Sequence, residues 1–525
     1  MISLLVDNGL PALALVRAAI VLSILVVLGL IANTIYNLRF SPLASFPGPA
    51  HLAISRLPQL LVTLSGRQLP WLIDLHNRYG GIVRIAPDTL SFTDERAWHD
   101  ICGSTKYAKE GMPKDPKMTS MLGGELLSPD PHRPRYAQPH GIMRRAMVAA
   151  QRHANVRELE PMIDKHIEEW LSALAERCQS HGVANMNELP SFFVCNLFFD
   201  LLLGENIDLF NDPAYRPWVH SFDRFAFGVT LLSLLNRFPM AHKPLLFMVR
   251  RWGDKERRSF LDPVYNIFDR RMQVLARTGK RRGDMLEMML EDDKASTTDS
   301  KNATMPKEML REFTPFLLLG ACDPLPGFIT AITYFVFRRR SLHMRERLLR
   351  EIRNNFASEQ EITVDRIAHS AKELPYLEAC FSEVVRCYAP GIGAERVVPG
   401  RGAMVADRWV PGGTIVVMQH QPQYLLRDNF TCADQYVPER WLTSEDERSE
   451  FAGDRRSCLH PFSVGPSSCP GQEIASVILR LAVCKMLYRY DIELDPSCEH
   501  WDANQVTYTT RFRPPLMVRV RQASA

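Results

Sequence analysis

One cysteine of this chain lies in a loop that could hold a thiolate against a flat ligand. Cys469 follows Phe462 and Gly465, precedes Gly471, and is close to a helix-like run at 472–488. Glycine lets the backbone adopt positive φ angles and pass close to a ligand, and amides at the start of a helix favour a deprotonated sulfur. Such a thiolate can be the axial ligand of a haem iron. The loop therefore predicts a haem site with Cys469 as the iron ligand. The alternative is that Cys469, one of 11 cysteines, is a small buried apolar residue.

Charged residues at two further places could support such a site. Glu383 and Arg386 lie three residues apart in a predicted helix at 374–388, so their side chains share one face. One carboxylate can accept two parallel hydrogen bonds from a guanidinium, and Arg440, in the Pro-Glu-Arg-Trp stretch 438–441, supplies a second guanidinium. Together with the cysteine loop and a proline-rich segment near the amino terminus, these motifs resemble the cytochrome P450 superfamily. The resemblance holds in order and spacing over nearly the whole chain.

The resemblance implies a fold, a cofactor and several residue roles. The expected fold is mainly α with a small β-rich part, and an N-terminal transmembrane helix precedes it. The expected cofactor is haem b (iron protoporphyrin IX), with Phe462, Gly465 and Gly471 against it beside the cysteine. The glutamate and the two arginines above would form a structural triad behind the proximal haem face, where they hold the haem-binding core and take no part in chemistry.

Basic residues could bind the carboxylates of the haem. His140 and Arg144 are four residues apart on one face of a predicted helix, although a solvated basic face is the alternative. Relatives usually carry tryptophan where this chain has His140. Arg396 matches the arginine that usually reaches a haem propionate. Ser467 stands where relatives have arginine or histidine, so one propionate contact is expected to be weakened or lost.

A long apolar segment, 308–340, resembles the helix that crosses the distal side of the haem. Most relatives have an acid followed by threonine there, and this pair relays protons during oxygen activation. The acid is kept as Asp323, but Pro324 replaces the threonine. Because proline has no N–H, it would leave the carbonyl of Gly320 unpaired and kink the helix. We expect a groove where ordered water or a substrate hydroxyl delivers protons. The alternative is that the prolines only mark a helix end.

Composition and hydropathy predict an anchored protein with no nucleic-acid partner. The 525 residues carry a net charge of +4 without a long block of like charge.

Residues 18–36 are an apolar run of the length needed to span a bilayer, followed by no convincing cleavage site. We expect a lumenal segment at 1–17, the anchor at 18–36, a proline-rich hinge at 37–50 and a catalytic domain at 51–525. The resemblance implies a single-pass protein of the endoplasmic reticulum membrane with a cytosolic body. Cysteines without paired spacing favour a reducing compartment.

Three other segments predict local structure. Residues 81–93 alternate or cluster apolar side chains between turn formers and predict a β-hairpin. The resemblance makes 222–252 a mobile lid over the substrate chamber, and a core helix pair is the alternative. The polar stretch 291–307 predicts a surface loop.

The motifs suggest a haem-thiolate monooxygenase that oxidises a hydrophobic secondary metabolite such as a terpenoid or polyketide. Segment 81–98 looks like filamentous-fungal members that act in secondary metabolism. No flavin or dinucleotide-binding motif is visible, so electrons are expected from a separate NADPH–cytochrome P450 reductase. Two alternatives stay open. One is a haem-thiolate isomerase or dehydratase that does not need NADPH, and the other is a non-catalytic haem-binding partner protein.

Overall fold

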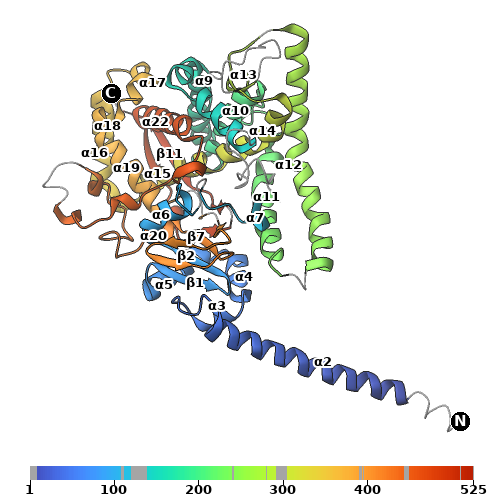
Figure 1. Cartoon of the computed structure of the whole chain (residues 1–525). Helices are drawn as coiled ribbons and strands as arrows, with labels where there is room; N and C mark the ends of the chain where they lie inside the picture. Colours follow the sequence, from blue (N-terminus) through green and yellow to red (C-terminus); the bar gives the residue numbers. More distant parts are fainter. Residues whose placement is uncertain are drawn as a thin grey trace.

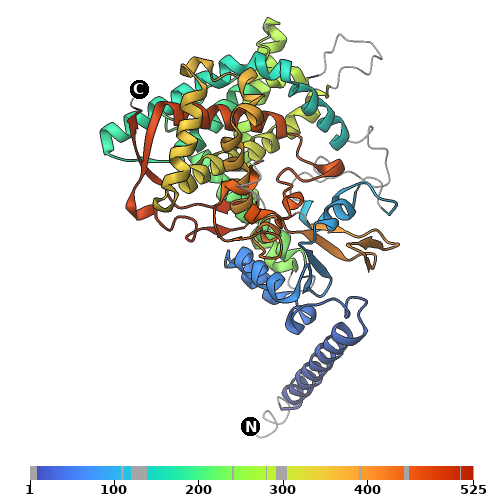
Figure 2. The ribbon, with the colours of Figure 1, turned by 90° about the vertical axis from the view of Figure 1, so that its left-hand side faces the viewer.

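A computed structural model describes residues 9–107, 111–119, 139–238, 242–279, 281–290, 304–389, 393, 395–442, 449–508 and 510–523. The body is mainly helical with several small sheets, and the first helix projects away from it (Figures 1 and 2). This is the fold class that the sequence predicted. Parts of several predicted segments lie outside the described residues: 1–8 of the lumenal segment, 239–241 of the lid, 291–303 of the polar loop, and, among others, 120–138 of the catalytic domain.

Helices make up most of the described chain. Those of the first part are α2 (Gly9–Ile35), the π-helical turn η1 (Tyr36–Phe40), α3 (Ala50–Ile54), α4 (Leu57–Leu64), α5 (Gln68–Tyr79), α6 (Arg96–Cys102) and α7 (Pro116–Thr119). Those of the helical body are α8 (Pro139–Ala150), α9 (His153–His181), α10 (Glu188–Leu203), α11 (Arg216–Leu235), α12 (His242–Thr278), α13 (Met285–Met289), α14 (Lys307–Cys322), α15 (Pro324–Phe337), α16 (Leu342–Asn355), α17 (Val364–Ile367), α18 (Ser370–Glu373), α19 (Pro375–Cys387), α20 (His420–Tyr424) and α22 (Gln472–Arg489). Short 3-10 turns are η4 (Arg339–Ser341), η5 (Glu359–Glu361), η6 (Pro438–Trp441), η7 (Ser449–Phe451), η8 (Arg456–Cys458), η9 (Gly465–Ser467) and η10 (Pro496–Cys498).

The largest sheet has the strand order β1-β2-β7-β4, from β1 (Ile82–Ala86), β2 (Thr89–Phe92), β7 (Ile415–Met418) and β4 (Glu395–Val397). The predicted hairpin is confirmed, because β1 and β2 pair antiparallel with Ile82 opposite Phe92. A parallel pairing of β2 with β7 joins this hairpin to the late part of the chain, and β4 completes the sheet antiparallel to β7.

Smaller sheets fasten the carboxyl-terminal part of the chain. One has the order β3-β11-β8, from β3 (Ala184–Asn185), β11 (Met517–Gln522) and β8 (Tyr490–Leu494). The others are hairpins, of β5 (Ala403–Val405) with β6 (Arg408–Val410), and of β9 (Val506–Thr507) with β10 (Arg511–Phe512).

Two helices in the centre of the body are enclosed on all sides. Every described side chain of α15 from Leu325 to Phe337 is buried, and in α10 the same holds from Leu189 to Leu203 except for Ser191. A helix that is apolar all round is stable in water only when it is covered by other elements. Aromatic packing helps to cover α10, since Trp170 of α9 stacks on Phe193 at a ring distance of 5.2 Å.

Two helical stretches of the described chain are long and apolar enough to cross a membrane. Lys307–Phe337 spans α14 and α15, and 72% of its most apolar 18-residue window is buried inside the body. Val16–Phe40 is 0% buried and lies near the amino terminus. The second stretch contains the predicted anchor at 18–36. The structure thus has an exposed apolar helix that could be a membrane anchor.

The helix predicted at 308–340 is interrupted at Asp323. α14 ends at Cys322 and α15 begins at Pro324, with Asp323 at φ −108° and ψ −53° between them. Hydrogen bonding resumes when the Gly327 N–H donates to the Asp323 carbonyl at 3.2 Å. The break is where the prolines predicted a kink, because Pro324 has no N–H to donate to Gly320.

Helices α11 and α12 pack side by side at the edge of the body (Figure 1). They span the predicted lid, and its mobility stays a prediction. The predicted helices at 374–388 and 472–488 are confirmed as α19 and α22 to within one residue at each end.

The chain leaving α2 is fastened to the sheet by Arg84. This buried arginine donates through Nη1 to the Asn37 carbonyl at 2.9 Å and through Nη2 to the Pro87 carbonyl at 2.7 Å. The Arg84 N–H also donates to the Pro47 carbonyl at 2.7 Å. The predicted hinge at 37–50 is therefore docked on β1 at both ends.

Truncation should separate anchoring from stability. A chain that begins at Asn33 keeps the Asn37 contacts with Arg84, whereas a chain that begins at Ser41 loses them. We expect only the full chain to resist extraction from membranes by alkaline carbonate. The Ser41 chain should unfold with about 1–3 kcal/mol less stability than the Asn33 chain, because a buried guanidinium loses an acceptor. Equal stability of the two truncated chains would contradict this role of Asn37.

Candidate active site

The cysteine loop is held by its backbone. The Cys469 N–H donates to the Phe462 carbonyl at 2.8 Å. Gly465 has a φ of 72°, and a Cβ atom there would lie 2.3 Å from the carbonyl oxygen of Cys102, at the end of α6. Only glycine fits, because both the backbone conformation and the neighbouring backbone exclude a side chain. Gly465 thus packs the loop onto α6, and it is not among the described residues that line the cavity in front of the loop.

That cavity has a volume of about 360 Å³. The loop contributes Phe462, Cys469 and Gly471 to its wall, and the break between α14 and α15 contributes Gly320 and Pro324. The cavity therefore brings together two segments about 150 residues apart in the sequence. The rest of the lining is largely apolar and comes from several helices, with Met143, Phe198, Phe313, Leu317 and Ile474 among its residues.

The Cys469 side chain is exposed to this cavity, at the start of α22. Burial raises the pKa of the Cys469 thiol, while the Gly471 N–H and the Arg144 cation act in the opposite direction. The expected effect of the amides at the helix start is present in the Gly471 N–H, but desolvation of the thiol is larger. A bound metal cation would reverse this balance, since a coordinating thiol is deprotonated.

The two basic residues predicted to act together on α8 lie in different places. His140 lines the cavity. Arg144 instead reaches the loop, where Nη2 donates to the Ser468 hydroxyl at 2.8 Å and Nη1 donates to the Ser468 carbonyl. Arg144 thus holds the residue next to Cys469. The Ser467 hydroxyl also lines the cavity and has no hydrogen-bond partner in the described structure.

The propionate arginine expected from the sequence lies beside a lysine that the sequence analysis missed. Arg396 is 3% exposed, donates through Nη1 to the Met112 carbonyl at 2.8 Å, and is not among the described lining residues. Lys114, its antiparallel bridge partner, does line the cavity. Burial lowers the pKa of Lys114 to about 8, and the Arg396 cation adds to this effect. No motif marks Lys114 in the sequence, and a bound anion would relieve its desolvation.

The carboxylate of Asp323 pairs with Arg513. Arg513 Nη2 lies 3.1 Å from Asp323 Oδ1, and the two side chains are 10% and 13% exposed. Arg513 also donates through Nε to the Asn187 side-chain oxygen at 2.9 Å. Asp323 is not among the described residues that line the cavity. Its part in proton delivery therefore stays a prediction, and it would require the carboxylate to leave Arg513.

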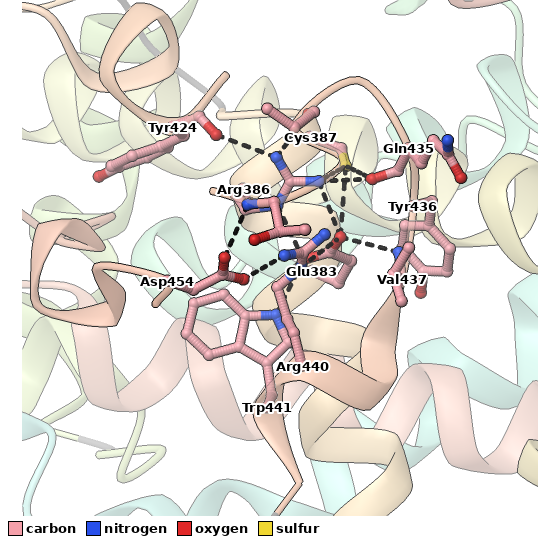
Figure 3. Close-up of polar contacts among 12 residues, drawn as sticks. Glu383, Arg386, Cys387, Tyr424, Gln435, Tyr436, Val437, Arg440, Trp441 and Asp454 are labelled. Atoms are coloured by element: carbon pink, nitrogen blue, oxygen red, sulfur yellow. Dashed lines mark hydrogen bonds and ion pairs between the residues drawn. The ribbon is translucent and has the colours of Figure 1, made fainter. Parts of the chain in front are cut away.

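The structure brings together the three charged residues predicted as a triad (Figure 3). Arg386 donates to both oxygens of Glu383, at 2.9 and 2.8 Å, and Arg440 Nε donates to Oε1 at 3.2 Å. All three side chains are 0% exposed. Glu383 also accepts from the Trp441 indole and the Val437 N–H, each at 2.8 Å.

A fourth charged residue of this cluster was missed. Asp454 pairs with Arg440 and is also 0% exposed, so two carboxylates balance two guanidinium groups in the buried cluster. Arg386 uses Nη1 to bind the carbonyls of Tyr424 and Ala433, at 2.9 and 2.7 Å. The cluster therefore ties α19 and η6 to the segments that lead into the cysteine loop. No spacing rule links Asp454 to the other three residues.

Comparison with known proteins agrees with this geometry. A family model described as Cytochrome P450 matches residues 59–516. The chain therefore belongs to the cytochrome P450 family, as the sequence motifs indicated. It is a cytochrome P450 monooxygenase, an oxidoreductase.

Fungal proteins are similar over almost the whole chain. Cytochrome P450 monooxygenase aneG of Aspergillus aculeatus is 30% identical over 502 residues, which cover 94% of this chain and 89% of aneG. Cytochrome P450 monooxygenase tpeC of Talaromyces stipitatus is 29% identical over 527 residues, which cover 98% and 97% of the two chains. The crystal structure of the cytochrome P450DA heme domain superposes with a TM-score of 0.68 at 15% identity, covering 91% of this chain and 98% of that one. This last likeness concerns the fold alone.

The buried cluster can be tested with two substitutions. Glu383→Ala leaves two arginines buried without their shared acceptor, which should cost about 3–5 kcal/mol and abolish haem incorporation. Trp441→Phe removes one hydrogen bond to the same carboxylate, so it should cost about 1.5–3 kcal/mol and leave haem bound. Chemical unfolding and the visible absorption spectrum would measure both effects. A normal haem spectrum for Glu383→Ala would refute the role of the triad.

Proposed function

We propose that this monooxygenase hydroxylates, or oxidises in several steps, a hydrophobic secondary metabolite such as a terpenoid or polyketide. It would use O2 and electrons from an NADPH–cytochrome P450 reductase. The protein would be anchored in the endoplasmic reticulum membrane by α2, with its body in the cytosol. The observation that carries the proposal is the apolar cavity between Cys469 and the broken central helix. The fungal sources of the similar monooxygenases support secondary metabolism as the setting.

The residues around the cavity fit haem b. Cys469 supplies a sulfur ligand, and the apolar side chains of α8, α10, α14 and α22 suit the faces of a macrocycle. Lys114, His140 and the hydroxyl of Ser467 are polar groups that haem carboxylates could bind. When bound, the haem supplies the oxygen-activating chemistry of the family.

The chain's own residues position and shield this chemistry. Arg144 and Gly465 fix the loop that carries Cys469, through Ser468 and α6 respectively. The apolar lining excludes water and favours a hydrophobic substrate. Asp323 is the acid at the helix break, and Arg513 holds its carboxylate in place.

The iron ligand is tested by Cys469→Ser in the full chain. The wild type, reduced under carbon monoxide, should show the absorption band of thiolate-ligated haem, and the variant should lack it because a hydroxyl is a poor iron ligand. Microsomes that contain the wild type and a reductase should change the accurate mass of the substrate by a gain of oxygen or a loss of hydrogen, only with NADPH. Turnover by Cys469→Ser at the wild-type rate would overturn the assignment.

A second candidate, an isomerase or dehydratase, is favoured by the proline at the helix break. If Pro324 shapes proton delivery, Pro324→Thr should change the share of NADPH electrons recovered in product by roughly twofold or more. Pro315→Thr is the matched control, because Pro315 lies inside α14, the helix before the break, and is not among the described lining residues. Unchanged coupling and products in Pro324→Thr would refute the role of Pro324. An unchanged formula or loss of water without NADPH would establish the second candidate.

A further inference from the structure

Arg237 joins three segments that are far apart in the sequence. It follows the last turn of α11, and its side chain is 4% exposed. Its Nη2 lies 2.7 Å from Asp115 Oδ2 and also pairs with Glu395. The neighbouring Asn236 donates through Nδ2 to the Lys117 carbonyl at 3.3 Å. The carboxyl end of α11 is thus fastened to both 113–117 and β4.

The two segments pair and form part of the wall of the cavity in front of Cys469, to which Lys114 contributes its side chain. The Asp115 N–H donates to the Glu395 carbonyl at 3.0 Å, and the Val397 N–H donates to the Pro113 carbonyl at 2.8 Å. Successive residues of extended backbone point to opposite sides. Lys114 lines the cavity in front of Cys469 on one side of the wall, while Asp115 meets Arg237 on the other.

A second, smaller cavity lies on the Arg237 side of this wall. It has a volume of about 60 Å³ and is lined by Arg237, Glu395, Thr63 and Gln68, among others. Arg237 Nη1, Thr63 Oγ1 and Gln68 Oε1 have no hydrogen-bond partner in the described structure. The cavity therefore offers the guanidinium both room to move and an alternative acceptor.

The energetics of the cluster favour the closed contact. Taking the guanidinium away from two largely buried carboxylates leaves their charge uncompensated, which is strongly unfavourable, so the open state is a minor one. The outer side of the wall is also next to apolar surface, because α4, which contributes Thr63, exposes Leu57 and Leu61 by 50% and 59%.

We propose that Arg237 is a latch that closes the end of α11 over the cavity wall, and that its release from Asp115 and Glu395 admits a hydrophobic substrate. This inference rests on the proposed function, since the wall in question bounds the cavity that is proposed to hold the haem. The closed state has Arg237 on the two carboxylates. In the open state Arg237 turns toward Gln68, and the wall at 113–115 separates from α11.

The test compares Arg237→Gln with Arg237→Lys and Glu395→Gln in the full chain. The control is Arg489→Gln, because Arg489 also pairs with two carboxylates, Glu168 and Glu359, at 2.6 and 2.5 Å, far from this wall in the sequence and on α22. Stopped-flow absorption would follow binding of a bulky azole and of imidazole to the ferric haem. Hydrogen exchange would follow the amides at the end of α11 and needs no haem.

For Arg237→Gln we expect roughly tenfold faster binding of the bulky azole, because the latch adds to the barrier for access. Amide exchange at the end of α11 should rise by about the same factor. Imidazole binding should change little, and Arg237→Lys should restore most of the wild-type rate, since an ammonium can still pair with both carboxylates. Arg489→Gln should leave both readouts at the wild-type value.

Unchanged exchange and unchanged azole binding in a folded Arg237→Gln chain would overturn the latch. If that variant does not fold, the same outcome in Glu395→Gln would overturn it. Equal acceleration in Arg489→Gln would also overturn it, because the effect would then be general loosening. A wild type without a thiolate-ligated haem spectrum would overturn the proposed function instead, and amide exchange would still decide the latch.

Discussion

The fully buried carboxylate of Glu383 constrains how several segments of this protein are placed. Two guanidinium groups, an indole and a backbone amide bind it, and Asp454 balances the remaining charge. Such a cluster is tolerated only when every member has its partners. Its partners come from α19, from η6 and from the chain around 424–454 that precedes the cysteine loop. The requirement to satisfy one charge therefore fixes several segments relative to one another.

The central helix shows the opposite case, in which backbone hydrogen bonds are left incomplete. Prolines at 324 and 326 cannot donate, so the helix breaks at Asp323 beside the cavity. The body tolerates this break because α15 is enclosed by apolar neighbours and because Arg513 binds the Asp323 carboxylate. The shape of the cavity at the helix break and the packing of the core thus both depend on the prolines and on Asp323 with its partner Arg513.

The wall formed by 113–115 and β4 connects the residues proposed to bind the cofactor with those proposed to control entry of substrate into the cavity. Its two faces carry different chemistry because extended backbone alternates its side chains. Lys114 faces the cavity, where a haem carboxylate would offset its desolvation. Asp115 and Glu395 face Arg237 at the end of α11. A change on one face would be transmitted to the other through the backbone hydrogen bonds that join the two segments.

The sequence by itself determined the cysteine loop, the pairing of Glu383 with Arg386, the β1–β2 hairpin and the exposed apolar helix. Each of these is a local pattern whose physical meaning depends on spacing within a few residues. Arg440 was found as well, because its own motif marks it. Tertiary structure alone decided the partners of Lys114, Arg237, Asp454 and Arg513, which come from segments distant in sequence. With 63 Lys and Arg residues and 59 Asp and Glu residues in the chain, charge alone could not single these out. The raised pKa of Cys469 also needed the structure, because burial depends on neighbours that no local pattern specifies.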